Sequence, residues 1–257
     1  MRLFRGKSGV AAAAIGVLAL AGCGSSGTTA APGGAPPGSA SPTAGPARTH
    51  GCLTEAQAKA GSIDLPASSG IRPAYFQQAD AGPARTAVVF SHQLDGSLCD
   101  WVPYLPEFTK AGYAVLAANV PGSPANDLPA ALTWLGTKGV TRVVLVGASK
   151  GGTGSLVAAA EPTPLPVAAV VSLSGPAQYS GDNAGKAVRT SQVPEFFGAE
   201  EDDSPFAEDA RTLHTAAAAP VKQLKIYPGY RHGADLLADG ALPDVLSFLA
   251  QQAPAAG

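Results

Sequence analysis

The sequence predicts an α/β fold in which helices cover both faces of a mostly parallel central sheet. Six short runs are apolar and rich in β-branched residues, as in strands buried on both sides. Stretches with helical periodicity separate most of these runs, and this alternation is typical of parallel strands joined by right-handed crossovers. A chain of 257 residues, 46% hydrophobic and 14% charged, can bury one sizeable core. We therefore expect a single folded domain at residues 51–257.

The predicted strands are recognised by their apolar runs. Three of them contain the strong patterns TAVVFS, YAVLAANV and VVLV, bounded by glycine, proline or polar residues. Before the first strand, Pro66 and Pro73 are expected only to keep the chain extended. The predicted strands are residues 85–91, 113–120, 140–146, 167–173, 193–197 and 223–227.

The predicted helices are recognised by their starting residues and by apolar residues at helical spacing. Thr54 followed by Gln57 is a capping box, Pro129 suits a first turn, and Ser204-Pro205 is a good helix start. The last helix carries leucines on one face up to the end of the domain. The predicted helices are residues 54–60, 101–110, 128–138, 151–160, 204–217 and 234–252. Pro103 and Pro106 are expected to confine the regular part of the helix at 101–110 to its later residues.

The first fifty residues are typical of export rather than of a folded core. Arg2, Arg5 and Lys7 precede a short apolar run, which together predict a signal peptide at residues 1–22. The sequence LAGC then resembles the lipobox of bacterial lipoproteins, which implies acylation of Cys23 and attachment to the bacterial cell membrane, outside the cytoplasm. Residues 23–50 are rich in Gly, Pro, Ser and Ala and are expected to form a disordered tether.

Charge and cysteine content limit the partners. The net charge is −2 and the basic residues form no long run, so a nucleic acid partner is excluded. We expect no cofactor, no metal ion and a monomer. With Cys23 lipidated, Cys52 and Cys99 remain, and in an oxidising compartment they either form a disulfide or stay as separate thiols.

The segment VTRVVLVGASKGGTG predicts a nucleophile elbow, in which a strand ends, a tight turn exposes a serine and a helix begins. Ser149 is the serine at this turn, and the glycines on either side avoid collisions with neighbouring backbone. The alternative is a glycine-rich turn whose serine merely caps the helix.

A reactive serine needs a histidine base and a carboxylate that orients it. His232 follows the last predicted strand in a loop before the final helix, and carboxyl ends of parallel strands share one edge of a sheet. His50 lies at the tether and His214 inside a helix, which makes them poorer candidates. Four consecutive carboxylates follow the strand at 193–197, and we favour Asp203 as the acid, with Asp202 as the alternative. The same cluster also suits a solvated acidic loop.

The elbow, the acid and the last-loop histidine occur in the order found in the α/β-hydrolase family, which residues 70–252 resemble. The resemblance implies a Ser149, Asp203 and His232 triad. It also implies an oxyanion hole made by the backbone N–H of Lys150 and that of Leu94 or Gln93, although Gln93 stands where the family usually has glycine. The side chain of Lys150 either favours anionic substrates or pairs with a carboxylate such as Asp95.

Many members of this family insert a helical cap after the strand equivalent to residues 167–173, but residues 174–192 are too few for one. The chain therefore resembles lidless esterases and dienelactone-hydrolase-like members, and an open site for an accessible ester is expected. We expect a serine ester hydrolase; the alternatives are an acyltransferase and a non-catalytic envelope binding protein on the same scaffold. Candidate pocket residues are His92, Trp101, Tyr104, Tyr179, Phe206 and Tyr230.

Overall fold

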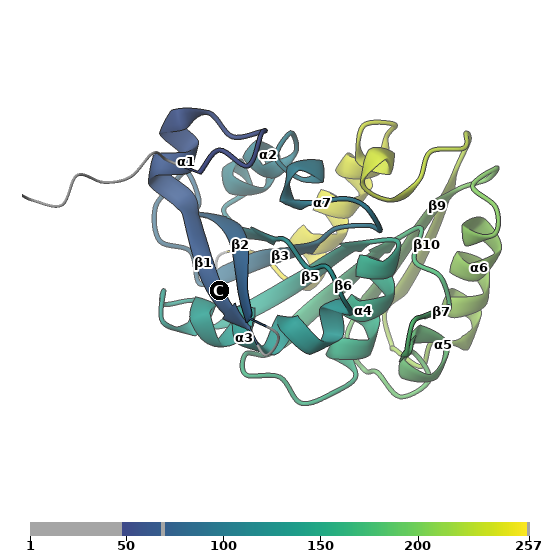
Figure 1. The fold of residues 1–257 in the computed structure, drawn as a ribbon. Helices are drawn as coiled ribbons and strands as arrows, with labels where there is room; N and C mark the ends of the chain where they lie inside the picture. The colour runs from purple at the N-terminus through teal and green to yellow at the C-terminus, as the bar shows by residue number, and fades with distance from the viewer. Residues whose placement is uncertain (1–47, 68–69, 256–257) are drawn as a thin grey trace, which may run out of the picture. The chain divides into compact units, whose positions relative to one another are not determined.

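The computed structural model describes residues 48–67 and 70–255, and Figure 1 shows their fold. The predicted signal peptide, Cys23 and most of the predicted tether lie outside this range. Within it, Arg48 already belongs to the folded part, because its guanidinium donates two hydrogen bonds of 2.7 Å to the Asp64 carboxylate. None of the described helices is long and apolar enough to cross a membrane.

The central sheet has eight strands in the order β1-β2-β4-β3-β5-β6-β9-β10. The strands from β4 to β10 in this order run parallel, whereas β2 is antiparallel to both β1 and β4. The predicted mostly parallel α/β sheet is thereby confirmed. The strands are β1 (Ser62–Ala67), β2 (Gly70–Gln77), β3 (Thr86–Ser91), β4 (Ala114–Ala118), β5 (Arg142–Ala148), β6 (Val167–Leu173), β9 (Glu195–Glu200) and β10 (Lys222–Tyr227).

Helices cover both faces of the sheet, as predicted. Along β3, Val88 and Phe90 belong to the core under α2 and α7, whereas Ala87 and Val89 belong to the core under α3, α4 and α6. Figure 1 shows α3 and α4 on one side of the sheet and α2 and α7 on the other. The helices are α1 (Glu55–Gly61), η1 (Leu98–Asp100), α2 (Leu105–Lys110), α3 (Pro124–Gly136), α4 (Lys150–Ala159), α5 (Ala184–Ala187), α6 (Phe206–Ala216), η2 (Gly233–Leu237) and α7 (Ala241–Gln252).

The sequence missed the antiparallel edge. Pro66 and Pro73 lie inside β1 and β2, where only an extended chain was expected. A proline has no N–H for a ladder, and strands near a sheet edge tolerate this loss. Two further short strands, β7 (Gln178–Tyr179) and β8 (Asp182–Asn183), form a separate hairpin. This hairpin and the single turn of α5 occupy the position where a cap would be inserted, so no large cap is present in the described residues.

Two predicted boundaries were wrong in ways that affect the site. β9 begins two residues later than predicted and continues to Glu200, because its backbone stays paired with β10 up to that residue. The predicted helix at 101–110 is regular only from Leu105, as its prolines led us to expect. The predicted last helix is broken into η2 and α7 by Gly240, which has a φ of 112°.

Candidate active site

Ser149 lies at the sharp turn between β5 and α4 and is held by strained backbone. Its φ is 50°, in the left-handed region that a serine rarely adopts. Its N–H donates to Leu173 O over 2.8 Å, which fastens the turn to the end of β6. A Cβ on Gly147 would overlap the backbone of Gly151, and a Cβ on Gly151 would overlap Ser91 O. The glycines are therefore required by close approach, while the strain falls on the serine.

His232 and Asp203 form a close pair beside this turn. The Nδ1 atom of His232 lies 2.9 and 3.1 Å from the two Asp203 carboxylate oxygens, and the Asp203 side chain is only 7% exposed. Donation from Nδ1 to the carboxylate leaves the proton-accepting lone pair on Nε2. Phe206, at the start of α6, packs its ring 4.3 Å from the imidazole. Asp202 instead points its side chain to solvent, and its N–H donates to Gly229 O.

The serine turn and the histidine loop are in direct contact. We call residues 228–234 the histidine loop. A Cβ on Gly233, the residue after His232, would lie 3.1 Å from the Cβ of Ala148, the residue before Ser149. The two candidate residues are thus the immediate neighbours of a packed contact, at the carboxyl edge of the sheet where strand order and spacing predict them.

Sequence reasoning did not predict that three side chains would bond the histidine loop, although Gln93 was a candidate oxyanion donor and Glu200 was part of the acidic cluster. Glu200 at the end of β9 accepts from Arg231 N over 2.6 Å, and Ser174 after β6 accepts from Gly233 N over 3.0 Å. The side-chain oxygen of Gln93 accepts from Ala234 N over 3.1 Å. Their only sequence signal is their position at or just after the carboxyl end of a strand.

The segment after β3 lies against the serine turn, as an oxyanion hole requires. The close approach of Gly151 to Ser91 O and His92 O places this segment directly over the start of α4. Gln93 O accepts from Gly96 N over 3.1 Å, which closes a tight turn. Leu94 lies within that turn and is 56% exposed.

His92 and Lys150 are buried side chains that hold the loop after β4, contrary to two expectations. Val120 N donates to His92 Nε2 over 2.8 Å, and His92 Nδ1 donates to Gln93 O over 2.7 Å. His92 is therefore not a pocket residue, and burial lowers its pKa. The Lys150 ammonium donates to Val120 O over 2.7 Å and to Pro121 O over 3.3 Å rather than to Asp95. Burial also lowers the pKa of Lys150, against a smaller opposite effect of the Asp95 charge.

The predicted pocket aromatics fall into different environments. Trp101 is fully buried and packs on Phe90 with ring centroids 4.9 Å apart, so it belongs to the core and not to a pocket wall. Tyr104 and Tyr179 are half-buried, at the start of α2 and in β7. Tyr230 is 81% exposed on the histidine loop. Only Phe206 touches a residue of the His232–Asp203 pair among the contacts between rings.

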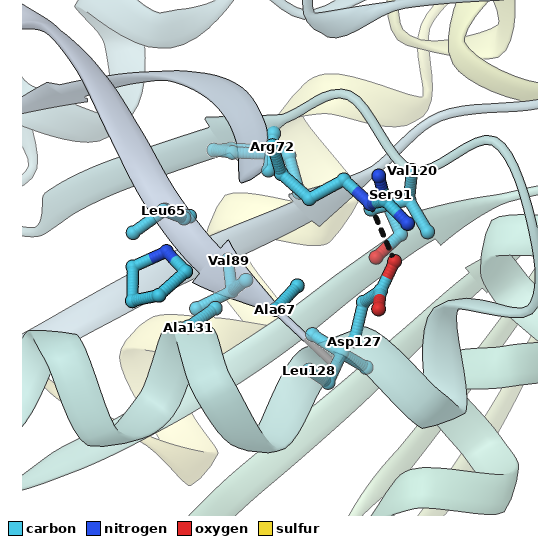
Figure 2. A pocket seen from close by; sticks show the side chains of 12 residues that line it. Leu65, Ala67, Arg72, Val89, Ser91, Val120, Asp127, Leu128 and Ala131 are labelled. Atoms are coloured by element: carbon cyan, nitrogen blue, oxygen red, sulfur yellow. Dashed lines mark hydrogen bonds and ion pairs between the residues drawn. The ribbon is translucent and has the colours of Figure 1, made fainter. Parts of the chain in front are cut away.

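A small cavity lies away from the pair, on the α3 side of the sheet (Figure 2). It is bordered by apolar side chains such as Leu65 and Val89, and the Arg72–Asp127 ion pair of 2.9 Å lies at its edge. Its volume of about 20 Å³ is enough for one water molecule and too small for an ester. The cavity is therefore not the substrate site.

Cys52 and Cys99 form a disulfide with a Cα–Cα distance of 5.7 Å. This bond settles the alternative left open by the sequence. It joins the beginning of the described domain to η1, which directly follows the segment over the serine turn. In the described residues, no three His, Cys, Asp or Glu side chains are grouped in a way that could hold a metal ion.

The sheet order, the crossing helices and the serine turn define the α/β-hydrolase fold. A sequence model of the Esterase family, described as "Putative esterase", matches residues 128–256. This match spans half of the chain, and the protein therefore belongs to that family. No curated protein sequence matches the chain significantly.

Solved esterases share this fold at low sequence identity. An esterase of Pyrococcus furiosus superposes with a TM-score of 0.64 at 16% identity, covering 74% of this chain and 90% of its own. The dienelactone hydrolase of Anabaena variabilis gives 0.60 at 23% identity, covering 74% and 94%. The esterase Est2 of Thermogutta terrifontis, with propionate bound, gives 0.64 at 17% identity, covering 77% and 96%. At these identities, the likeness shows the fold alone.

Proposed function

We propose that this protein is a serine ester hydrolase whose triad is Ser149, His232 and Asp203. The observation that carries the proposal is the 2.9 Å contact between His232 Nδ1 and Asp203, in a loop packed against a serine turn with positive φ. A carboxylate on Nδ1 leaves Nε2 as the base, which is the arrangement a serine nucleophile needs. Membership of the Esterase family supports ester bonds as the target.

The proposed reaction has two halves, acylation and deacylation of Ser149, and each half includes two proton transfers. Ser149 Oγ forms a bond to the acyl carbon while its proton passes to His232 Nε2. The backbone N–H of Lys150 and that of Leu94 or Gln93 stabilise the resulting oxyanion. When the tetrahedral intermediate collapses, the ester C–O bond breaks and the leaving alcohol takes the proton from His232. Water then repeats the same steps on the acyl-enzyme and releases the carboxylic acid.

The proposed substrate is an accessible carboxylic ester, either a short acyl ester or an ester group on a larger molecule. The β7–β8 hairpin and α5 replace a cap, and neither is large enough to enclose a substrate. Two large hydrophobic residues are exposed on the segments that carry the proposed site: Tyr230 on the histidine loop and Leu94 after β3. An open site of this kind supports selection of substrates by whether their ester group can reach Ser149 and fit the surface around it, rather than by enclosure of the substrate.

The proposed function is tested with a fluorophosphonate probe and p-nitrophenyl acetate. Wild-type protein should be labelled and should hydrolyse the ester, whereas S149A should lose labelling and about 10⁶-fold in kcat. S180A is the matched control, because Ser180 is an exposed serine that also has positive φ, at 53°. Equal labelling of wild type and S149A would reject the proposal. Ester exchange in added methanol, in place of acid release, would reassign the protein as an acyltransferase.

We also propose that the enzyme acts outside the cytoplasm, anchored through acylated Cys23. This residue lies outside the described range, and the support is its lipobox sequence together with the Cys52–Cys99 disulfide, which suits an oxidising compartment. Replacing Cys23 with serine should move the protein from the membrane fraction to the soluble fraction, with unchanged ester hydrolysis, while S25A should not. Membrane retention of C23S that equals wild type would contradict the anchor.

A further inference from the structure

Three backbone N–H groups around His232 each donate to a side-chain oxygen. The donors are Arg231, Gly233 and Ala234 of the histidine loop, with donor–acceptor distances of 2.6, 3.0 and 3.1 Å. In folded proteins, about two-thirds of hydrogen bonds join one backbone group to another. Here the main chain on both sides of the histidine is fixed from outside the loop. The three acceptors are Glu200, Ser174 and Gln93.

The three acceptors come from separate parts of the sheet. Glu200 is the last residue of β9, Ser174 follows β6, and Gln93 follows β3 in the segment proposed to supply an oxyanion donor. Ser174 is fully buried and Glu200 is 1% exposed, so water does not replace either acceptor easily. The histidine loop is thus held at three strand ends, and two of them, the ends of β3 and β6, also contact the serine turn.

Two glycines of the loop are shaped around these acceptors. A Cβ on Gly229 would overlap the Glu200 carboxylate, and a Cβ on Gly233 would overlap the Gln93 side-chain oxygen. Both glycines have positive φ, at 125° and 63°. The acceptor oxygens therefore lie directly against the loop backbone, in space that only glycine leaves open.

Glu200 makes the strongest of the three contacts. Its acceptor is a carboxylate, and charge-assisted hydrogen bonds of this length are about twice as strong as neutral ones. The second carboxylate oxygen has no hydrogen-bond partner among the described residues. Burying a carboxylate that accepts only one backbone hydrogen bond is unfavourable for folding. Glu200 therefore points to a role in the site rather than in general stability.

We propose that Glu200, Ser174 and Gln93 are positioning residues that set where His232 stands relative to Ser149. This inference rests on the proposed ester hydrolase function. Asp203 binds only Nδ1 and so fixes the rotation of the ring. The three acceptors fix the backbone that carries the ring. A displacement of about 1 Å at a reacting group can cost about 100-fold in rate, which makes this backbone anchoring significant for turnover.

The test compares three variants of two adjacent glutamates. E200M has nearly the same side-chain size and no acceptor, and its kcat for p-nitrophenyl acetate should fall about 30-fold with KM within about twofold. E200Q keeps an acceptor oxygen without the charge and should recover most of this loss. E201M is the matched control, since Glu201 is the next residue in the chain, is exposed and pairs with Arg211 of α6. Its kcat should stay within about twofold of wild type.

Each outcome shows whether Glu200 acts by holding the position of the histidine loop or by its negative charge. Recovery by E200Q supports positioning, because only the hydrogen bond is restored. If E200Q loses as much kcat as E200M, the effect is electrostatic and the proposal is wrong. Equal kcat in wild type and E200M also overturns it. All variants are assayed below the midpoint of thermal unfolding measured by circular dichroism, so that loss of fold is not counted as loss of rate.

A second variant covers the case in which E200M does not fold. S174A removes one neutral acceptor and should lower kcat about fivefold with little change in KM, by the loss of a single hydrogen bond of about 1 kcal/mol. A wild-type kcat for S174A would overturn the proposal without reference to Glu200. These results are distinct from failure of the proposed function, in which wild-type protein itself shows no labelling or hydrolysis that depends on Ser149.

Discussion

The serine turn and the histidine loop meet at one edge of the sheet but are fixed by different means. Ser149 is fixed by local backbone: a φ of 50°, a strand before it, a helix after it and glycines packed against neighbouring main chain. His232 is fixed by distant side chains that bond its loop. The first arrangement is encoded within a few residues, whereas the second needs three strand ends to be assembled. Variants that disturb one arrangement at a time can separate them.

The largest loss is expected from a methyl group in the serine turn. In G151A the new Cβ overlaps the carbonyl oxygen of Ser91, and backbone cannot move aside as a flexible side chain can. We expect about 1–3 kcal/mol lower free energy of unfolding and about 100-fold lower kcat. Urea unfolding and p-nitrophenyl acetate hydrolysis measure both. The control is G181A, where the methyl group meets open space. A wild-type rate in G151A would show that the turn tolerates displacement.

A smaller loss is expected from the same change in the histidine loop. In G229A the methyl group overlaps the Glu200 carboxylate, which can rotate away at the expense of its bond to Arg231. We expect a roughly tenfold lower kcat and about 1–2 kcal/mol lower stability. G240A is the matched control, since Gly240 has a similar φ of 112° but open space around it. If both variants lose the same activity, backbone strain rather than the Glu200 contact explains the effect.

No loss of turnover is expected at the opposite end of β9. Glu195 is fully buried there, and burial raises its pKa to about 7, against smaller opposing effects of Ser191 and Lys222. The folded protein therefore keeps a proton that the unfolded chain releases near its ordinary pKa of 4.5. Stability should fall by about 3 kcal/mol as pH rises from about 4.5 to 7 and then level off.

The variant E195Q should remove this pH dependence of stability and leave kcat unchanged. Unfolding in urea at pH 5, 6, 7 and 8 measures the slope for both proteins. E208Q is the control, because Glu208 is exposed on α6. A change in kcat for E195Q would mean that the two ends of β9 are coupled. The comparison of the serine turn with the histidine loop would then have to include the whole strand.

The sequence predicted the parallel sheet and the serine turn because both depend on short-range patterns. Apolar runs locate β3, β5 and β6, and the glycines around Ser149 mark the turn. The end of β9 was missed, since Glu200 reads as part of a solvated acidic loop. Its burial depends on the loop bearing Arg231, which lies about thirty residues away in the chain. The contact between Gln93 and Ala234 spans 141 residues and has no local signal at all.

The side-chain environment of Lys150 was also beyond the sequence. A lysine beside a nucleophile suggests an ion pair or an anionic substrate, but among the described residues its ammonium forms no ion pair within 4 Å. The ammonium instead binds the carbonyls of Val120 and Pro121, where the loop after β4 passes over the start of α4. Backbone carbonyls cannot be recognised from residue types, so only the assembled loop reveals the partner.

The edge of the sheet holds two imidazoles that differ in their freedom to exchange a proton. His92 uses both ring nitrogens, because Nδ1 donates to Gln93 O and Nε2 accepts from Val120 N–H. It can gain a second proton only by breaking the bond to Val120, and burial lowers its pKa further. Among the described residues, no protein group bonds Nε2 of His232. Hydrogen bonding thus distinguishes the two histidines: both ring nitrogens of His92 are occupied, whereas His232 keeps one nitrogen available for the proposed proton transfer.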